Sequence, residues 1–198
     1  MRGTEVAVNE VLSGAIVVPL RARALEPRVV GLIAAAQTRL PQRRRSARAP
    51  AIAYTYRVAP ERDLWGIVRG LTILGVAGVE LVDGVLRVRD IAVVAEARRN
   101  GLGRALLAHL RNAYGGPELL ADATEDAAPF FVACGFDAEP LGAFRSSGLP
   151  RIRCTLPADR PSFDMPVEVE LRLNRASSRA PARAPPLRTE VSRSEEHT

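Results

Sequence analysis

The sequence of 198 residues contains no lysine, and all 28 of its basic residues are arginine. Frequent alanine, glycine and proline accompany this bias, which indicates GC-rich coding DNA, and we expect a bacterial protein whose basicity partly reflects codon usage. The net charge of +6 by itself favours an anionic partner. However, residues 1–50 hold 9 arginines and 3 acidic residues, whereas residues 51–150 hold 10 and 12. Nucleic acid is therefore the less favoured partner.

Cysteine and long apolar runs are also scarce. Cys134 and Cys154 are too few for a disulfide framework or a four-ligand zinc site, which favours a reduced, cytoplasmic protein without a metal. The apolar runs 29–36 and 71–79 are much shorter than the roughly 20 residues of a membrane-spanning helix. The first residues lack the apolar stretch and cleavage site of a secretory signal. We therefore expect no membrane contact.

What is present suits a soluble globular domain, since 47% of the residues are hydrophobic and 25% are charged. We expect an uncertain N-terminal segment at 1–14, a folded domain at 15–156 and a largely disordered extension at 157–198, in which 167–173 has the alternation of one more strand. Residues 193–198 (RSEEHT) resemble a translated sequencing-library adapter, so we leave the tail out of the fold prediction.

Turn residues and hydrophobic periodicity predict an order of elements. The dipeptide Asp83-Gly84 predicts a tight hairpin, and leucine at 102, 106 and 110 predicts an amphipathic helix. Residues 41–50 lack periodicity and are predicted to be a basic linker. Strands and helices in this order predict an α/β or α+β domain with helices on a mixed sheet. The expected strands are 15–20, 51–58, 65–74, 76–81, 85–94, 119–123, 136–140 and 151–156, and the expected helices are 25–40, 101–114 and 125–134.

A glycine-bearing loop between a strand and a helix is the segment that carries chemistry. Strand 90–94 leads through Arg98 and Arg99 to Gly101 and Gly103, where the leucine-periodic helix begins. Such a loop gathers backbone N–H groups and the positive end of a helix dipole, and arginine forks match phosphate oxygens. The pattern predicts a pyrophosphate-binding cradle, and a helix start with solvated arginines is the alternative. The dinucleotide fingerprint G-x-G-x-x-G is not met, because residue 106 is leucine.

Two segments together resemble the GNAT N-acetyltransferase superfamily. The first is R-x-x-G-x-G at 98–103, which follows a strand containing I-A-V and resembles the acetyl-coenzyme A motif of that family. The second is AAPFFVACGF at 127–136, which resembles the family's A-x-x-F-Y-x-x-x-G-F and follows at the expected distance. The resemblance covers residues 65–156 well and residues 15–64 only loosely.

The resemblance implies a mixed, mostly antiparallel central sheet, flanked by helices and splayed in the middle to admit coenzyme A. It implies an N-acyltransferase, without a metal, that transfers the acetyl group of acetyl-CoA to a small-molecule amine by direct attack. Backbone groups of Val93 and Val94 would hold the pantetheine arm, and Phe131 would wall the thiol pocket. We expect a monomer or a homodimer. The remaining cofactor-binding residues would be Arg98, Arg99, Asn100, Gly101, Leu102, Gly103 and Arg104.

Two positions depart from the family pattern. Phe131 stands where many members carry the tyrosine thought to protonate the departing thiolate. Family bases often project from the strand before I-A-V, where this chain has Arg87 and Arg89, which cannot deprotonate an ammonium group. Asp90 and Glu80 are the nearest carboxylates and the candidate general bases, and alternation places Asp90 on the other face from the two arginines. If those arginines face the acceptor groove, they favour an anionic acceptor.

Other interpretations stay open at this stage. Phenylalanine at 131 and the missing base are also expected of a catalytically degenerate acetyl-CoA sensor or interaction domain. The arginine run 43–45 and the arginine-rich tail would suit a nucleic-acid-binding protein. Glu80 would otherwise be a solvated strand residue, and Asp90 a structural partner of an arginine. His109 and Cys134 lack a catalytic partner in the sequence and are most simply structural.

Overall fold

Seven strands and four α-helices make up residues 14–160, the part of the chain that the computed structural model describes. The order along the sheet is β1-β2-β3-β4-β5-β7-β6, and neighbours are antiparallel except for the parallel pair of β4 and β5. The strands are β1 (Ala15–Pro19), β2 (Arg62–Arg69), β3 (Thr72–Val82), β4 (Val85–Val93), β5 (Leu119–Ala123), β6 (Asp137–Ala143) and β7 (Pro150–Leu156). The helices are α2 (Pro27–Ala36), α3 (Gln42–Val58), α4 (Leu102–Ala113) and α5 (Ala128–Ala133), with 3-10 turns η1 (Arg21–Arg23) and η2 (Ala95–Ala97).

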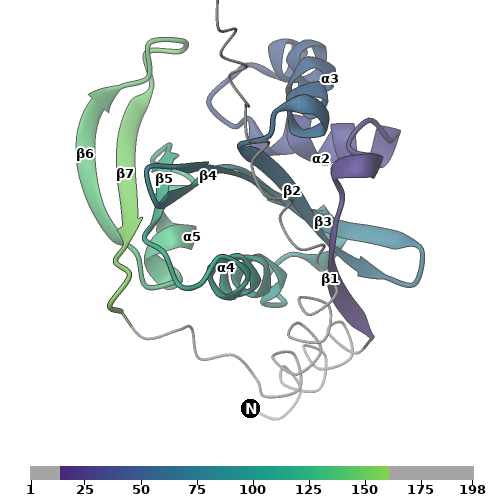
Figure 1. Ribbon diagram of the computed structural model, residues 1–198. Coiled ribbons are helices and arrows are strands. Elements are labelled where there is room, and N and C mark those ends of the chain that lie inside the picture. Colours follow the sequence, from purple (N-terminus) through teal and green to yellow (C-terminus); the bar gives the residue numbers. More distant parts are fainter. Residues whose placement is uncertain (1–13, 161–198) are drawn as a thin grey trace, which may run out of the picture.

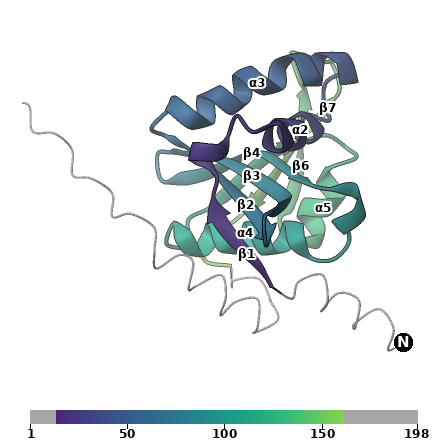
Figure 2. The same ribbon diagram turned by 90° about the vertical axis from the view of Figure 1, so that its right-hand side faces the viewer.

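The helices form a layer on each face of the sheet. Figures 1 and 2 show α2 and α3 on one face and α4 and α5 on the other. Helix α4 buries Leu102, Leu106 and Leu110, which lie four residues apart and so share one side of the helix. The mixed, mostly antiparallel sheet flanked by helices confirms the predicted fold class.

Local turn chemistry explains the elements that were predicted well. The hairpin between β3 and β4 turns at Asp83 and Gly84, whose φ values of 50° and 80° suit a two-residue turn. Strand β5 has the predicted bounds, and α4 lies within the predicted helix 101–114. Helix α5 is shorter than the predicted 125–134, because Glu125 and Asp126 belong to the turn that leads into it. The predictions for 1–13 and 161–198 lie outside the described residues.

The prediction for residues 41–58 was wrong. The expected basic linker and the expected strand together form one helix, α3, which even contains Pro50. The buried residues of this helix are Ala49, Ala53 and Tyr56, whose spacing of four and three residues is helical. Tyrosine, threonine and valine suggested a strand, but strand propensity is weak where tertiary packing favours a helix. The helical period of this segment rests mainly on alanines, and the prediction did not take them into account.

The predicted strand 65–74 was also wrong, because it crosses a hairpin. Strand β2 ends at Arg69, and β3 begins only at Thr72. Gly70 has a φ of 57°, a left-handed conformation that suits glycine, and Leu71 at the tip is 97% exposed. An apolar leucine at a turn made the two strands look continuous.

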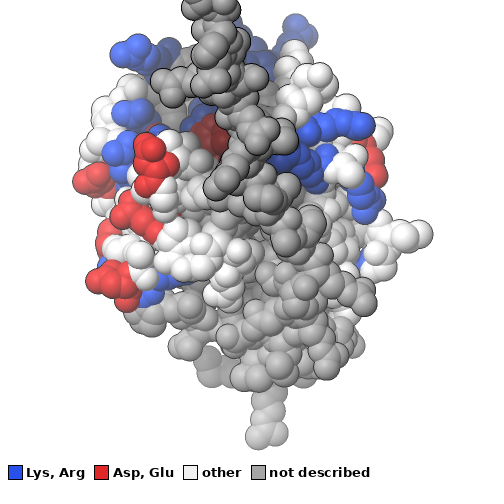
Figure 3. Space-filling model, in the orientation of Figure 1, with Lys and Arg blue, Asp and Glu red and all other residues white. Residues whose placement is uncertain are grey.

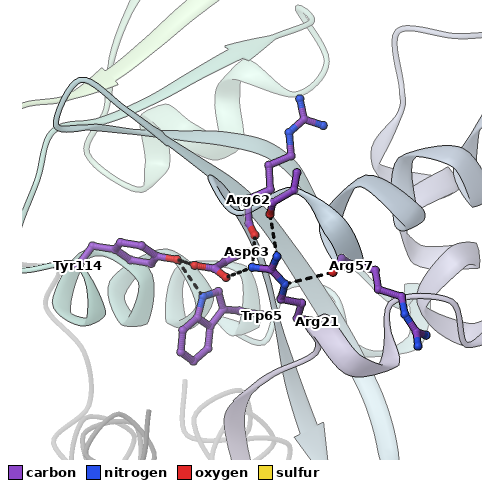
Figure 4. Close-up of polar contacts among 7 residues, drawn as sticks. Arg21, Arg57, Arg62, Asp63, Trp65 and Tyr114 are labelled. Carbon is purple, nitrogen blue, oxygen red and sulfur yellow. Dashed lines mark hydrogen bonds and ion pairs between the residues drawn. The ribbon is translucent and has the colours of Figure 1, made fainter. Parts of the chain in front are cut away.

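A polar network fastens the end of α3 to the sheet and to α4 (Figure 4). Arg21 forms an ion pair with Asp63 at 3.6 Å, and the Tyr114 hydroxyl donates to the same carboxylate at 2.5 Å. Trp65 donates from its indole N–H to the Tyr114 oxygen at 3.5 Å. A cation beside the last carbonyls of a helix is favourable. Arg21 donates to the carbonyl oxygens of Arg57, Ala59 and Arg62.

Candidate functional site

The sheet opens between β4 and β5. These strands pair only where residues 86–88 lie beside residues 119–121, and beyond that point they separate. A cavity of about 690 Å³ occupies the opening, bounded by both strands, the start of α4, α5, the loop after α2 and Phe144. Pairing that stops after three residues leaves room for a ligand in the middle of the domain. The predicted splayed sheet is therefore present.

One end of the cavity is the glycine-bearing loop. Arg99 and Gly101 have φ values of 63° and 76°, so two left-handed residues turn the chain into α4. The helix begins at Leu102, and its N-cap residue Gly101 provides no side-chain cap. The first backbone bond of the helix is from the Ala105 N–H to the Gly101 carbonyl. The amides of the first turn are therefore uncapped beside the positive end of the helix dipole, which is an anion-binding arrangement.

Gly103 has a different role in the same loop. A Cβ atom at this position would lie 2.8 Å from the Phe130 ring, so glycine lets α4 and α5 approach closely. Phe130 and Phe131 stack edge to face at 5.1 Å, and Phe131 packs against Phe136 at 5.3 Å. The aromatic motif therefore forms the cavity wall next to the loop.

Of the ten predicted cofactor-binding residues, eight line the cavity. Val94 is buried instead, and its N–H donates to the Leu74 carbonyl at 2.8 Å. Asn100 lies in the loop outside the lining. Arg98 donates from Nε to the Val93 carbonyl at 3.0 Å. The eight lining residues are Val93, Arg98, Arg99, Gly101, Leu102, Gly103, Arg104 and Phe131.

Asp90, the first of the two candidate bases, also belongs to the cavity wall. It is 4% exposed and lines the cavity from β4. The Tyr56 hydroxyl donates to Oδ2, and the Gln37 amide donates to Oδ1. Burial raises the pKa of Asp90 above its ordinary value, against the opposing effect of these two hydrogen bonds. Burial and the neighbouring Asp90 also raise the pKa of Tyr56.

The predicted orientation of Asp90 was wrong because β4 contains a β-bulge. The register of β3 and β4 shifts between Gly78 and Val79, so that Gly78 pairs with Asp90 and Glu80 pairs with Arg87. Gly78 and Glu80 are two residues apart and share a face, so Arg87 and Asp90 share it too. A Cβ on Gly78 would overlap the Tyr56 ring, so this glycine makes room for the tyrosine that reaches Asp90.

Glu80, the second candidate base, lies outside the cavity lining and forms ion pairs with two arginines. Its carboxylate lies 3.1 Å from Arg62 and 3.6 Å from Arg89. Arg89 itself lines the cavity, whereas Arg87 does not. Asp90 is therefore the better placed of the two carboxylates.

Several residues of the acceptor side were missed at the sequence level. Arg39, from the loop after α2, places its guanidinium 5.7 Å from the ring centre of Phe144, which follows β6. Thr38 and Thr124 bring their hydroxyl oxygens within 3.4 Å of each other. These four residues line the cavity but come from three distant segments. No local motif marks them, and the helical spacing of Ala49, Ala53 and Tyr56 is the one signal that would have placed Tyr56 on this side.

The remaining polar candidates lie apart from the cavity or in its wall. His109 is 1% exposed, stacks on Trp65 at 4.6 Å, and burial lowers its pKa to about 4. Cys134 is a buried free thiol in the cavity wall. Residues 14–160 contain no cluster of three or more potential metal ligands. Within that same range, no helix has the length and apolar character needed to cross a membrane.

The surface in Figure 3 carries both signs of charge. Arginines and carboxylates stand side by side over β6 and β7, on the left of the view, rather than forming one continuous basic surface. Residues 43–45 lie on the ordered helix α3 and not in a linker.

Comparison with known proteins gives the same assignment as the geometry. The acetyltransferase (GNAT) domain profile matches residues 60–138, from just before β2 to the start of β6. Residues 60–138 therefore resemble a GNAT acetyltransferase domain. The resemblance noted in the sequence is thereby confirmed. No curated protein matches the chain.

Solved structures share the fold of this GNAT-like domain at low sequence identity. A protein of Desulfovibrio desulfuricans assigned to the GNAT acetyltransferases is 22% identical, with a TM-score of 0.58, over 73% of this chain and 99% of that one. An aminoglycoside 6'-N-acetyltransferase in complex with coenzyme A is 14% identical, with a TM-score of 0.55, over 69% and 95%. The PaiA N-acetyltransferase of Thermoplasma acidophilum, also with coenzyme A, is 11% identical, with a TM-score of 0.55, over 70% and 97%.

Proposed function

We propose that this chain transfers the acetyl group of acetyl-CoA to a small-molecule amine. The observation that carries the proposal is the uncapped start of α4, with left-handed Arg99 and Gly101, at the mouth of a cavity between separated strands. That arrangement binds a pyrophosphate through backbone amides. We further propose 15–156 as the folding unit, in a cytoplasmic bacterial protein that is a monomer or a homodimer.

The donor side would hold the coenzyme in two parts. The amides of residues 101–104 would bind the pyrophosphate, with Arg98 and Arg99 adding charge. The free edge of β4 beyond the split, at Val93, would hydrogen-bond the pantetheine arm, and Phe131 would exclude water from the thioester. Acetyl-CoA supplies an activated acetyl group, so the protein contributes mainly the position of the amine.

Asp90 would accept the proton of the attacking amine. Each carboxylate oxygen has two lone pairs, so the bonds from Tyr56 and Gln37 leave room for another donor. Because burial raises the pKa of Asp90, its carboxylate is a stronger base than an exposed aspartate. Tyr56 and Gln37 would fix its orientation. Asp90→Asn should lower kcat by about a hundredfold, since general base catalysis contributes on that order.

Phe131 favours a second candidate function. Its ring cannot protonate a departing thiolate, so a domain that binds acetyl-CoA without turnover is the alternative. Water from the cavity mouth would serve as the proton source in the enzyme. Release of free thiol in the presence of an amine panel separates the two functions, because a sensor binds and releases none.

Coenzyme binding is the first test. At a hundred times its dissociation constant, acetyl-CoA should stabilise the chain by about 2.7 kcal/mol, which raises the melting temperature by about 5–10 °C. Gly101→Val, which forces a branched residue into a left-handed conformation, should abolish this increase. Gly31→Ala, on the exposed side of α2 with nothing within 4 Å, is the matched control and should keep it. No increase in the unaltered chain at millimolar acetyl-CoA would overturn the proposal.

A further inference from the structure

Four arginines of β4 and β7 lie on one face of the sheet, beside the point where β4 and β5 separate. The sheet register places three of them together, and the fourth, at the β-bulge of β4, forms an ion pair with Glu80 of the same face. Arg87 of β4 lies beside Leu120 of β5. Asp122 lies two residues after Leu120 on the same face of β5, and it pairs with Arg153 of β7. We call this set the arginine face; it consists of Arg87, Arg89, Arg151 and Arg153.

Polar atoms of the arginine face are buried but lack hydrogen bonds. In the described part of the chain, seven buried side-chain nitrogen or oxygen atoms make no hydrogen bond, and four of them lie here. Buried polar groups in proteins are almost always paired with protein, water or ligand. Three of these atoms are arginine donors, and their gathering in one place indicates a site that a further group fills. The four atoms are Nε of Arg87, Arg151 and Arg153 and Oδ1 of Asp122.

The carboxylates nearby do not neutralise these arginines. Asp122 is shared by the two arginines of β7, at 3.5 and 3.9 Å, which are ion-pair rather than hydrogen-bond distances. Glu80 is shared by Arg62 and Arg89, and Glu139 lies opposite Arg153 in the pairing of β6 and β7. Within residues 14–160, Arg87 has no ion pair. The face therefore attracts an anion.

The arginine face adjoins the acceptor side of the cavity. Arg89 belongs to the face and lines the cavity beside Asp90, and Asp122, which pairs with Arg151 and Arg153, lines it too. Arg87 and Asp90 lie on the same face, opposite Glu80 and Gly78 of β3. Their separation therefore equals that of two strand residues two positions apart, which is about 7 Å. One small molecule spans that distance with an amine at Asp90 and an anionic group at the arginines.

We propose that the arginine face binds a carboxylate or phosphate of the acceptor, so that the substrate is the amine of a small acid. This inference rests on the proposed function, since it names the class of acceptor for that reaction. Guanidinium groups bind both anions through two parallel hydrogen bonds. The four-arginine face acts as a specificity determinant, and Asp90 remains the proton acceptor.

Direct anion binding tests the inference without turnover. The protein is saturated with coenzyme A, so that its pyrophosphate site is filled, and its melting temperature is followed with added glutarate or inorganic phosphate. We expect an increase of a few degrees with one or both, and the stronger probe identifies carboxylate or phosphate. The double variant Arg87→Gln, Arg153→Gln should lose the increase. Arg69→Gln, an exposed arginine at the far end of β2, should keep it.

An increase that survives in the double variant, or none in the unaltered chain with either probe, overturns the inference. Arg153→Lys guards against a merely structural effect, because it keeps the charge and should retain part of the increase. If the chain fails to bind coenzyme A, the proposed function fails. The glutarate and phosphate titrations of the same chain still report on the arginine face.

Acceptor preference gives the second readout. Each amino acid in the panel is paired with its carboxamide, and kcat/KM is measured from thiol release. We expect at least a tenfold preference for the acid, carried by KM of the acceptor. The double variant should reduce the preference below threefold without changing KM for acetyl-CoA. Equal kcat/KM for acid and amide, with turnover intact, contradicts the inference and leaves the proposed function standing.

Discussion

The donor side and the acceptor side of the cavity are built on different principles. The donor side is one continuous segment, from the end of β4 through the loop into α4, and it presents backbone amides. The acceptor side gathers side chains from the loop after α2, from α3 and β5, and from Phe144. The matched family domain, residues 60–138, contains the whole donor side but neither α2, α3 nor β7. Binding through backbone leaves a local sequence pattern, whereas binding through collected side chains leaves none.

Gly78→Ala should have the largest effect, and it acts on the acceptor side. The new methyl group would overlap the Tyr56 ring, which is fully buried, so the tyrosine must move away from Asp90. Overpacking and a lost hydrogen bond to a carboxylate together cost about 3 kcal/mol. Urea unfolding measures the loss. In the same assay, Gly31→Ala should raise stability by about 1 kcal/mol, because an exposed helical glycine gains helix propensity.

Two buried ionisable groups, one on each side of the sheet, should respond to pH in opposite directions. His109, on α4, has a folded pKa of about 4 against an ordinary value of 6.5. Between these values the unfolded chain binds the extra proton, so stability is lost as the pH falls. The loss between pH 7 and pH 5 should be about 2 kcal/mol. His109→Leu should flatten this slope in urea titrations, and a variant that keeps the full slope would contradict the assignment.

Asp90, on the acceptor side, should show the reverse effect. Its folded pKa is raised above 3.8, so the folded chain holds the extra proton, and stability is lost as the pH rises through the folded pKa. Asp90→Asn removes that loss. Its amide oxygen would accept from Tyr56. Its amide nitrogen would donate to Oε1 of Gln37 after the Gln37 amide turns over, and that oxygen lacks a partner among the described residues. We therefore expect the variant to be more stable than the parent at pH 7. The difference between the variant and the parent should vanish near pH 3, and an unchanged difference would exclude titration of Asp90.

The same contrast explains which elements and site residues could be predicted from the sequence. The glycines of the loop, the leucine period of α4 and the Asp83-Gly84 turn are local signals, and each predicted its element. Helix α3 was missed because its period rests on alanines and a proline interrupts it. The β-bulge beside Gly78 depends on pairing with another strand, so alternation along β4 alone placed Asp90 on the wrong face. Arg39 and Phe144 meet only in three dimensions.

Gly101→Ala should have the smallest effect on stability and the sharpest effect on coenzyme binding. No atom lies within 4 Å of the added Cβ, so only the left-handed φ of 76° is penalised, at about 1 kcal/mol. Relief of that strain turns the amides of the first turn of α4 away from the pyrophosphate, and the dissociation constant for coenzyme A should rise about tenfold. Calorimetric titration of both Gly101→Ala and Gly78→Ala with coenzyme A gives the decisive comparison. Each variant adds one methyl group, the first on the donor side and the second on the acceptor side. If Gly78→Ala weakens coenzyme binding more than Gly101→Ala does, the two sides are not separate, and the coenzyme reaches the buried contact between Tyr56 and Asp90.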